Sequence, residues 1–446
     1  MGLPTFKGGI HPYEGKELSE DKPIQSLLSK GEMVFPLSQH IGKPAKPLVA
    51  KGDEVLAGQK LGEADGFVSA CIISSVSGKV KAIEPRMTAS GSRVLSVIVE
   101  NDGQYRNADG FGQERDVKNL TNNEIRTIVR EAGITGLGGA GFPTHVKLTP
   151  KDEAAIDTII VNGAECEPYL TSDYRMMLEN PESIIGGLNI ILQIFPNARG
   201  VIAVESNKPK AIELMTRLVE NEPRITVAPL KTKYPQGGER TIIYAVTGRK
   251  INSSMLPLDV GCIVDNVATV SAIYNAVAKS TPLIERVISI TGDAIANPQN
   301  YKVRMGTSYS ELIEASGGFK AEPKKVISGG PMMGQALFDL DIPVTRISSA
   351  LTCFTKDQVA EEATTACIRC GRCVEVCPSR VIPQKMMEAA KVSDLERFVR
   401  LDGMECCECG CCSYVCPARI PLTQAFKEMR SAVMSSRKKA KEVQNV

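Results

Sequence analysis

Two cysteine runs near the end of the chain constrain its fold more than any other feature. Both follow the pattern Cys-x2-Cys-x2-Cys-x3-Cys-Pro, the first beginning at Cys367 and the second at Cys406. This is the ligand spacing of paired [4Fe–4S] clusters, in which the fourth cysteine of each run binds the other cluster. The spacing therefore predicts one cluster held by Cys367, Cys370, Cys373 and Cys416, and a second held by Cys406, Cys409, Cys412 and Cys377.

A pair of zinc sites is the alternative for eight cysteines in one region. Zinc knuckles favour two Cys-x2-Cys pairs, or a histidine for each ion. Here each run has three cysteines at equal intervals and closes with Cys-Pro, which favours the clusters. We therefore expect one-electron transfer chemistry.

Six further cysteines lie outside these positions. Cys407 and Cys411 are out of register with the Cys-Pro pair of the second run, so we expect them beside the ligands, although the sequence leaves a shifted ligand set open. The isolated cysteines are predicted to be small core residues: Cys71, Cys166, Cys262 and Cys353.

The composition limits the class of protein and of partner. The chain has 446 residues, enough for three or four domains, and its 53 Lys and Arg nearly balance its 51 Asp and Glu, so its charge gives no reason to expect nucleic acid. It has no apolar run of about 18 residues, which predicts no membrane span, and no apolar signal-peptide segment at its start. Because the cysteines gather in one region, they indicate metal ligands in a reducing compartment.

The residue patterns predict a multidomain chain with α/β and α+β parts. Short apolar stretches between glycine turns, at 49–62 and 74–80, predict a small β sandwich. This part of the sequence resembles lipoyl-type domains, which carry a modified lysine on a mobile hairpin. The equivalent position falls near Phe67, so we expect a docking module without that lysine. The predicted divisions are an irregular N-terminal segment (1–30), the lipoyl-like β sandwich (31–112), an α/β domain (113–282), a small α+β domain (283–350), a two-cluster domain (351–430) and a basic tail (431–446).

The middle of the chain alternates between helix and strand patterns. A helix is predicted at 123–132, strands at 157–162 and 200–205, and a helix at 208–219. This alternation indicates an α/β domain with a mostly parallel sheet.

Individual helix and strand patterns can also be recognised in the small α+β domain, the two-cluster domain and the basic tail. The small α+β domain has a predicted strand at 286–292 and a helix at 309–314 that ends at two glycines. Between the cysteine runs, the polar helix-forming stretch 384–401 suggests the α-helical ferredoxin type. The basic residues 437–441 are predicted to be a solvated, frayed end, with a weak attraction to anionic lipid as the alternative.

A glycine-rich loop, Gly-Leu-Gly-Gly-Ala-Gly-Phe at 136–142, follows the first predicted helix of the α/β domain. Such a loop lets backbone N–H groups approach a phosphate closely. It matches neither the dinucleotide fingerprint nor a Walker loop. By itself it would fit a mobile surface turn equally well.

Three further segments accompany the loop. Asn162–Pro168 follows a predicted strand, at the carboxyl end of the sheet, where ligands of α/β folds bind. Tyr234–Glu239 and Val264–Val267 come later in the chain. Together with the loop, these segments resemble the flavin/NADH-binding subunit of respiratory complex I.

This resemblance implies a Rossmann-like domain that binds FMN and NAD(H). In that family the loop, a lysine, the Asn/Glu turn and a late asparagine surround FMN, while a phenylalanine and acidic residues shape the NADH pocket. The matching positions are Gly136, Gly138, Gly139, Phe142, Lys147, Asn162, Glu165, Glu167, Tyr234, Glu239, Val264 and Asn266. The chain departs from the family at Leu137, Ala164, Gly238 and Asp265, which alters the charge of the pocket and bears on NAD more than on FMN. His145, beside the loop, is a candidate for contact with a cofactor phosphate.

The order of the predicted domains along the chain points to a more specific family. The segment Phe6–Pro12, the lipoyl-like module, the flavin domain, a β-grasp (SLBB-like) domain ending at Ser328–Gly334 and the two cluster runs are together similar to the C subunits of Rnf complexes. Those bacterial membrane assemblies couple ferredoxin:NAD oxidoreduction to Na+ or H+ transport. The resemblance implies a peripheral protein on the cytoplasmic side of the plasma membrane. It would contact the membrane through partner subunits and transfer electrons between two [4Fe–4S] clusters, FMN and NAD(H).

Two rival interpretations remain at this point. A soluble flavin/Fe–S cobalamin reductase shares the loop and the cluster runs, but Phe6–Pro12 favours the Rnf family. A non-catalytic electron-wire subunit would hold clusters without flavin or nucleotide, and the loop with its three companion segments argues against it. No catalytic side chain is expected, because hydride passes directly between nicotinamide and flavin.

Overall fold

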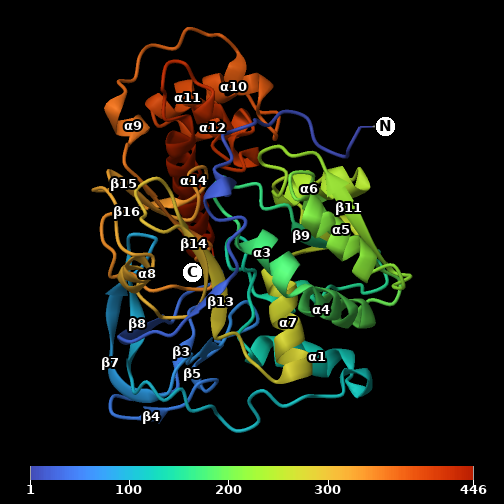
Figure 1. Ribbon diagram of the computed structural model, residues 1–446. Coiled ribbons are helices and arrows are strands. Elements are labelled where there is room, and N and C mark those ends of the chain that lie inside the picture. Colours follow the sequence, from blue (N-terminus) through green and yellow to red (C-terminus); the bar gives the residue numbers. More distant parts are fainter. Residues whose placement is uncertain (1, 445–446) are drawn as a thin grey trace.

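The structure is a computed structural model that describes the backbone of residues 2–444 and the side chains up to residue 440. The cysteine domain lies at one end of the molecule, the N-terminal β module lies toward the opposite end, and the α/β domain extends along one side (Figure 1). No helix among the described residues combines the length and the apolar character that crossing a bilayer requires.

The N-terminal module consists of two small antiparallel sheets around one apolar core. One sheet has the order β2-β8-β7-β4 and the other β3-β5-β6. Met33, Phe35, Leu61 and Val97 are almost fully buried between them, which agrees with the predicted β sandwich. The strands are β2 (Glu32–Pro36), β3 (Lys46–Pro47), β4 (Glu54–Val55), β5 (Lys60–Glu63), β6 (Ile72–Ile73), β7 (Gly78–Met87) and β8 (Arg93–Asn101).

The α/β domain is built on a four-stranded parallel sheet of order β11-β10-β9-β12. The strands are β9 (Thr158–Gly163), β10 (Arg199–Glu205), β11 (Ile225–Leu230) and β12 (Cys262–Asn266). The helices are α1 (Asn122–Glu131), α2 (Thr144–Lys147), α3 (Ser172–Glu179), α4 (Pro181–Ile194), α5 (Pro209–Leu218), α6 (Glu239–Thr247) and α7 (Val267–Lys279). The predicted helices and strands of this domain are present to within two residues.

Side-chain alternation along these strands explains the layers. Ile159 and Val161 pack with α1, α4 and α7, whereas Ile160 of the same strand packs with α6 on the other face. Because both faces are covered by helices, the middle of each strand is mainly apolar. The carboxyl ends of β9 and β12 are thereby left at one edge of the sheet, next to the glycine loop.

The small α+β domain contains a six-stranded sheet of order β1-β14-β13-β17-β15-β16. Its elements are β1 (Gln25–Leu27), β13 (Glu285–Thr291), β14 (Gln299–Arg304), α8 (Tyr309–Ala315), β15 (Lys325–Ser328), β16 (Gln335–Leu337) and β17 (Ala350–Phe354). The predicted boundaries at 30 and 350 cut this sheet, because β1 comes from the supposedly irregular segment and β17 extends past 350. A three-residue strand is too short to produce a readable periodicity.

The cysteine domain is helical. Its helices are α9 (Gln358–Glu361), α10 (Arg372–Glu375), α11 (Pro383–Lys391), α12 (Leu395–Arg400), α13 (Cys411–Tyr414) and α14 (Leu422–Gln444). The predicted helical stretch 384–401 is two helices, because Ser393 has a φ of 52° and Asp394 caps α12 by accepting from the Arg397 N–H at 2.8 Å.

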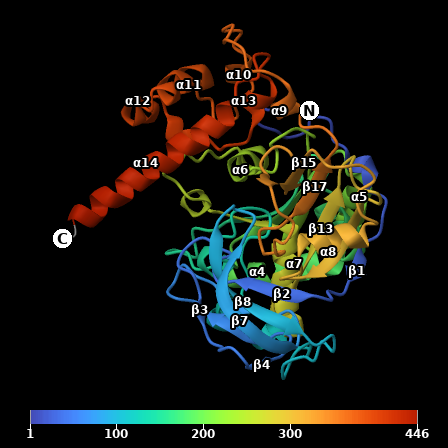
Figure 2. The ribbon, with the colours of Figure 1, turned by 90° about the vertical axis from the view of Figure 1, so that its left-hand side faces the viewer.

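The predicted frayed tail is instead helical. Helix α14 continues to Gln444 and projects away from the rest of the molecule (Figure 2). Phe426, Met429 and Val433 are buried and anchor its first half, and the following Ala, Lys and Glu residues favour helix. Residues 445–446 lie outside the described part of the chain.

Candidate functional site

The glycine loop approaches the carboxyl ends of β9 and β12. The Leu137 N–H donates to Thr269 Oγ1 of α7 at 2.9 Å. A Cβ added to Gly138 would lie 2.8 Å from the Cβ of Asn266, so this close approach requires glycine. Asn266 in turn lies opposite Asn162 in the β12–β9 register.

The tip of the loop is open. Gly138, Gly139 and Ala140 are exposed, and no acceptor among the described residues takes a hydrogen bond from their N–H groups. A Cβ added to Gly139 would meet nothing within 4 Å. Unpaired N–H groups on an open loop fit the phosphate of a flavin or nucleotide.

Lys147 supplies a cation under the loop. Its Nζ donates to Val264 O at 2.7 Å and to Asp265 Oδ1 at 3.1 Å, and lies 4.0 Å from where a Cβ on Gly136 would be. Asp265 is buried, its Oδ2 has no partner, and burial raises the pKa of its carboxyl group, with Lys147 opposing that rise. The acid that replaces the family's asparagine is thus compensated by Lys147.

The two glutamates of the turn after β9 make contacts within the protein. Glu165 has a φ of 46° and accepts hydrogen bonds from the Asp173 N–H at 2.7 Å and the Tyr174 N–H at 3.2 Å, at the start of α3. Glu167 Oε1 accepts from the N–H groups of Met332 and Met333, at 2.7 and 3.0 Å. Both carboxylates hold neighbouring segments in place; their contact with a nucleotide stays a prediction.

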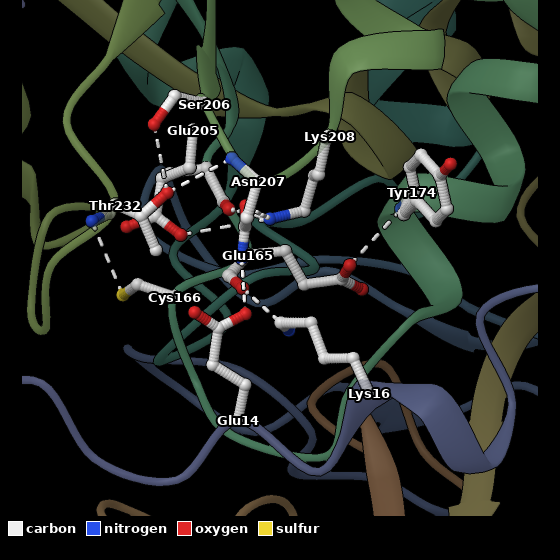
Figure 3. A network of polar contacts seen from close by, with 12 residues as sticks. Glu14, Lys16, Glu165, Cys166, Tyr174, Glu205, Ser206, Asn207, Lys208 and Thr232 are labelled. Atoms are coloured by element: carbon white, nitrogen blue, oxygen red, sulfur yellow. Dashed lines mark hydrogen bonds and ion pairs between the residues drawn. The ribbon is translucent and has the colours of Figure 1, made fainter.

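Two buried lysines that the sequence did not single out hold this turn from behind (Figure 3). Lys16, from the N-terminal segment, donates to the carbonyl oxygens of Glu165, Glu167 and Leu170 at 2.9, 3.2 and 2.6 Å. Lys208 donates to Ala164 O at 2.6 Å. A lone lysine in an irregular segment, such as Lys16, or at the start of a helix, such as Lys208, gives no signal of burial, which is why sequence reasoning missed both.

The remaining predicted residues occupy different surroundings. Asn162 Nδ2 donates to Gly237 O at 2.8 Å, and Asn266 Oδ1 caps α7 while its Nδ2 donates to Asp173 Oδ2 at 2.6 Å. Phe142 is half-buried, and Glu239 is exposed at the first position of α6.

His145 contacts the N-terminal module, and its expected contact with a cofactor phosphate stays a prediction. It is buried, its Nε2 is 2.9 Å from Phe67 O, and its ring meets the Phe67 ring edge-on. Burial lowers the pKa of its imidazole. His145 therefore joins the α/β domain to the N-terminal module.

The eight run cysteines form two groups. The outer group, Cys367, Cys370, Cys373 and Cys416, surrounds a cavity of about 340 Å³. The inner group, Cys377, Cys406, Cys409 and Cys412, lines a smaller cavity of about 20 Å³ together with Cys407 and Cys411. Each group thus takes three cysteines from one run and one from the other, the arrangement that crossed ligation requires.

The spacing of the thiols distinguishes a cluster from a single ion. Tetrahedral zinc with Zn–S bonds of about 2.3 Å would bring its sulfur atoms within about 4 Å of one another. Among the described residues, the only set of three potential metal-ligand atoms within 4.8 Å of one another belongs to Glu63, Cys71 and Glu131, which lie outside the cysteine domain. The outer cysteines surround a space rather than a point, which fits a cubane better than zinc; for the inner group the spacing of the cysteines in the sequence favours the cluster.

The inner group is joined to the α/β domain and to the N-terminal segment. Tyr234 is buried, its hydroxyl donates to Cys409 O at 2.8 Å, and its backbone exchanges two hydrogen bonds with Ile10. The Gly9 N–H donates to Val376 O at 2.7 Å, next to Cys377. Cys411, which also lines the inner cavity, packs in the same apolar cluster with its Sγ 3.9 Å from Tyr234 O.

Four family models match the chain, and together they span most of it. Their descriptions and matched residues are the RnfC Barrel sandwich hybrid domain (4–104), the Nuo51 FMN-binding domain (129–275), the SLBB domain (287–336) and the 4Fe-4S dicluster domain (366–420).

Three curated relatives are similar over most of the chain, and each is the C subunit of its complex. The relative from the proton-translocating ferredoxin:NAD(+) oxidoreductase complex of Clostridium ljungdahlii is 45% identical, with 86% of this chain and 84% of the relative covered. Its Na(+)-translocating counterpart from Acetobacterium woodii is 44% identical, with 86% and 87% covered. The relative from the ion-translocating oxidoreductase complex of Rhodobacter capsulatus is 39% identical, with 95% and 82% covered.

Among solved structures, an NAD+-reducing [NiFe]-hydrogenase in the H2-reduced state is similar, with a TM-score of 0.49 and 16% identity. The similarity covers 72% of this chain and 62% of that chain.

Proposed function

Because the chain belongs to the family of C subunits of ion-translocating ferredoxin:NAD(+) oxidoreductase complexes, we propose that it exchanges electrons between NAD(H) and partner subunits. It does so through FMN at the glycine loop and two [4Fe–4S] clusters in the outer and inner cysteine groups. Ion transport belongs to the partners. The cytoplasmic face of the membrane, reached through those partners, is the proposed location.

One observation carries this proposal: the flavin side and the inner cysteine group share one short segment. In residues 234–239, Gly237 accepts the hydrogen bond from Asn162, and Tyr234 donates to the carbonyl of Cys409. Only two residues, Pro235 and Gln236, therefore separate the contact with the candidate flavin site from the contact with the candidate cluster. A short connection of this kind is what electron transfer between two bound groups requires, and it argues against the electron-wire alternative. The cobalamin reductase would share the connection, and the identity with C subunits over most of the chain argues against that alternative.

The residues present fit the groups that the proposal requires. When bound, FMN supplies the conversion between the two-electron chemistry of NAD(H) and the one-electron chemistry of the clusters. The open N–H groups at Gly138 and Gly139 bind its phosphate, and Lys147 places a positive charge beneath the loop. The inner group lies on the flavin side, whereas the outer group has two exposed cysteines, Cys367 and Cys370, and faces the partners.

Cofactor analysis of the anaerobically purified chain tests the proposal. We expect about one acid-released FMN and about eight iron atoms per chain, and reduction of both clusters by NADH. Gly138→Val should lose flavin while retaining iron, because a side chain there would collide with Asn266. A chain with its full iron and no flavin would instead support the electron-wire alternative.

A further inference from the structure

Two buried arginines lie beneath the glycine loop. Arg286, on β13, is 6% exposed, and Arg346 is 1% exposed. Arg286 donates from Nη2 to Leu137 O at 3.1 Å and from Nη1 to Arg346 O, and Arg346 donates from Nη2 to Cys71 O. These contacts join the α/β domain, the SLBB domain and the N-terminal module directly under the loop.

Neither arginine has a counter-ion within the described residues. Their side chains contact only carbonyl oxygens, and three N–H donors stay without a partner: Arg286 Nε, Arg346 Nε and Arg346 Nη1. Burial lowers the pKa of each guanidinium to about 10, so both remain charged at neutral pH. A buried charge without a partner is strongly unfavourable, and it persists where something else compensates it.

The nearest acid does not compensate these charges. Asp173 favours the charged form of Arg286 from a distance, but its Oδ2 is engaged with Asn266 Nδ2 and makes no ion pair with the arginine. Burial, reinforced by Glu165, raises the pKa of the Asp173 carboxyl group to about 7, so it is only partly ionised near neutral pH. A net positive charge therefore remains under the loop.

An anion bound at the open side of the loop would lie where it can compensate the positive charge of the buried arginines. Leu137, whose carbonyl oxygen is held by Arg286, directly precedes Gly138 and Gly139, whose N–H groups are exposed and unpaired. Pulling the carbonyl of Leu137 toward the protein interior fixes the orientation of the peptide that carries the Gly138 N–H. Arg286 lies outside the matched FMN-binding region, residues 129–275, and is supplied by the neighbouring domain.

We propose that Arg286 is a positioning residue for the flavin phosphate: it orients the loop N–H groups through Leu137 and supplies the charge that the phosphate dianion compensates. This inference rests on the proposed binding of FMN at the loop. Arg346 supports it by presenting its carbonyl oxygen to Arg286. The flavin ring itself gains nothing from this arrangement.

Comparing FMN with riboflavin, which lacks the phosphate, tests the inference without any measurement of activity. The flavin-free full-length protein is titrated with each ligand, following flavin fluorescence. Arg286→Met should weaken FMN binding by about tenfold or more, the range of a lost charged contact, and leave riboflavin binding within about twofold. Arg286→Lys should retain part of the FMN preference. An equal loss for both ligands, or no loss for either, would overturn the inference.

Arg304→Met is the matched control. Arg304 lies on the neighbouring strand β14, is largely buried and pairs with Glu285 at 3.2 Å, so its replacement should leave the preference for FMN over riboflavin unchanged. If Arg286→Met does not fold, the unmodified protein still decides the matter. Inorganic phosphate should compete with FMN but not with riboflavin, and the absence of that difference would overturn the inference. Failure of the unmodified protein to bind either flavin would overturn the proposed function itself.

Discussion

The outer and inner cysteine groups are built from runs whose backbones bend at equivalent positions. Arg369 and Glu408, each two residues after the first cysteine, have φ values of 56° and 57°, and their N–H groups each lie 3.4 Å from that cysteine's sulfur. Gly371 and Gly410 follow the second cysteine with φ values of 78° and 83°. The local structure of the two runs is therefore the same.

Their surroundings differ. The outer cavity is lined only by residues of the cysteine domain, and Cys367 and Cys370 are exposed. Three of the inner cysteines, Cys377, Cys409 and Cys412, are less than 10% exposed, and residues 9–10, Tyr234 and Met332 pack around them. Ligand loops of the same local structure thus have different surroundings, and the proposed function assigns the inner group to exchange with the flavin and the outer group to exchange with a partner.

Replacing one crossed ligand at a time should have the largest effect, because each replacement removes a different cluster. Cys416→Ser should remove the outer cluster and lower the iron content from about eight to about four atoms per chain. FMN should be retained, and NADH should still reduce the inner cluster. Cys377→Ser should instead remove the inner cluster and slow reduction of the outer cluster by NADH. Iron analysis and electron paramagnetic resonance distinguish the two outcomes.

Cys407→Ser is the control for these substitutions, since Cys407 lines the inner cavity but is out of register with the run. Both clusters should survive this change. Loss of the inner cluster would show that the ligand set is shifted, and loss of the same cluster in the Cys416 and Cys377 variants would show that the ligands do not cross.

Solvent access gives the second prediction. Because susceptibility of cysteine sites follows exposure, the outer cluster should be destroyed by ferricyanide and a chelator roughly tenfold faster than the inner one. Iron release should therefore show a fast and a slow phase of similar size. The fast phase should be missing in Cys416→Ser; a single phase in the unmodified protein would mean that the two environments do not differ in access.

Local patterns made the parallel sheet and the spacing of the cysteines predictable. Alternation of helix and strand is repeated over many residues in the α/β domain, so single ambiguous positions do not matter. The structure also brings the eight cysteines together in the two predicted sets. The spacing of three thiolates, and the need for a fourth ligand, can be recognised within a short stretch of sequence.

Contacts between domains could not be predicted from local sequence patterns. Lys16, Arg286 and Arg346 are long cationic side chains, which are usually solvated, and only the tertiary fold buries them. Glu165 and Glu167 were expected at the nucleotide pocket, yet their hydrogen bonds go to backbone groups that no spacing rule connects to them. Strand β1 joins its sheet through three residues that carry no distinctive pattern.

The smallest expected effect comes from removing the hydroxyl of Tyr234, which lies between the candidate flavin site and the inner cysteine group. Tyr234→Phe leaves the ring in place and removes the hydrogen bond to Cys409 O, together with the interaction of the hydroxyl with the Glu167 carboxylate. The buried carbonyl then lacks its donor, which should cost about 1 kcal/mol of stability. The midpoint potential of the inner cluster should change while that of the outer cluster does not, because the outer cavity has no contact with Tyr234. Tyr414→Phe, at an exposed tyrosine of the same domain, should change neither potential. If Tyr234→Phe shifted both potentials equally, or shifted only that of the outer cluster, the assignment of the inner group to the flavin side would fail.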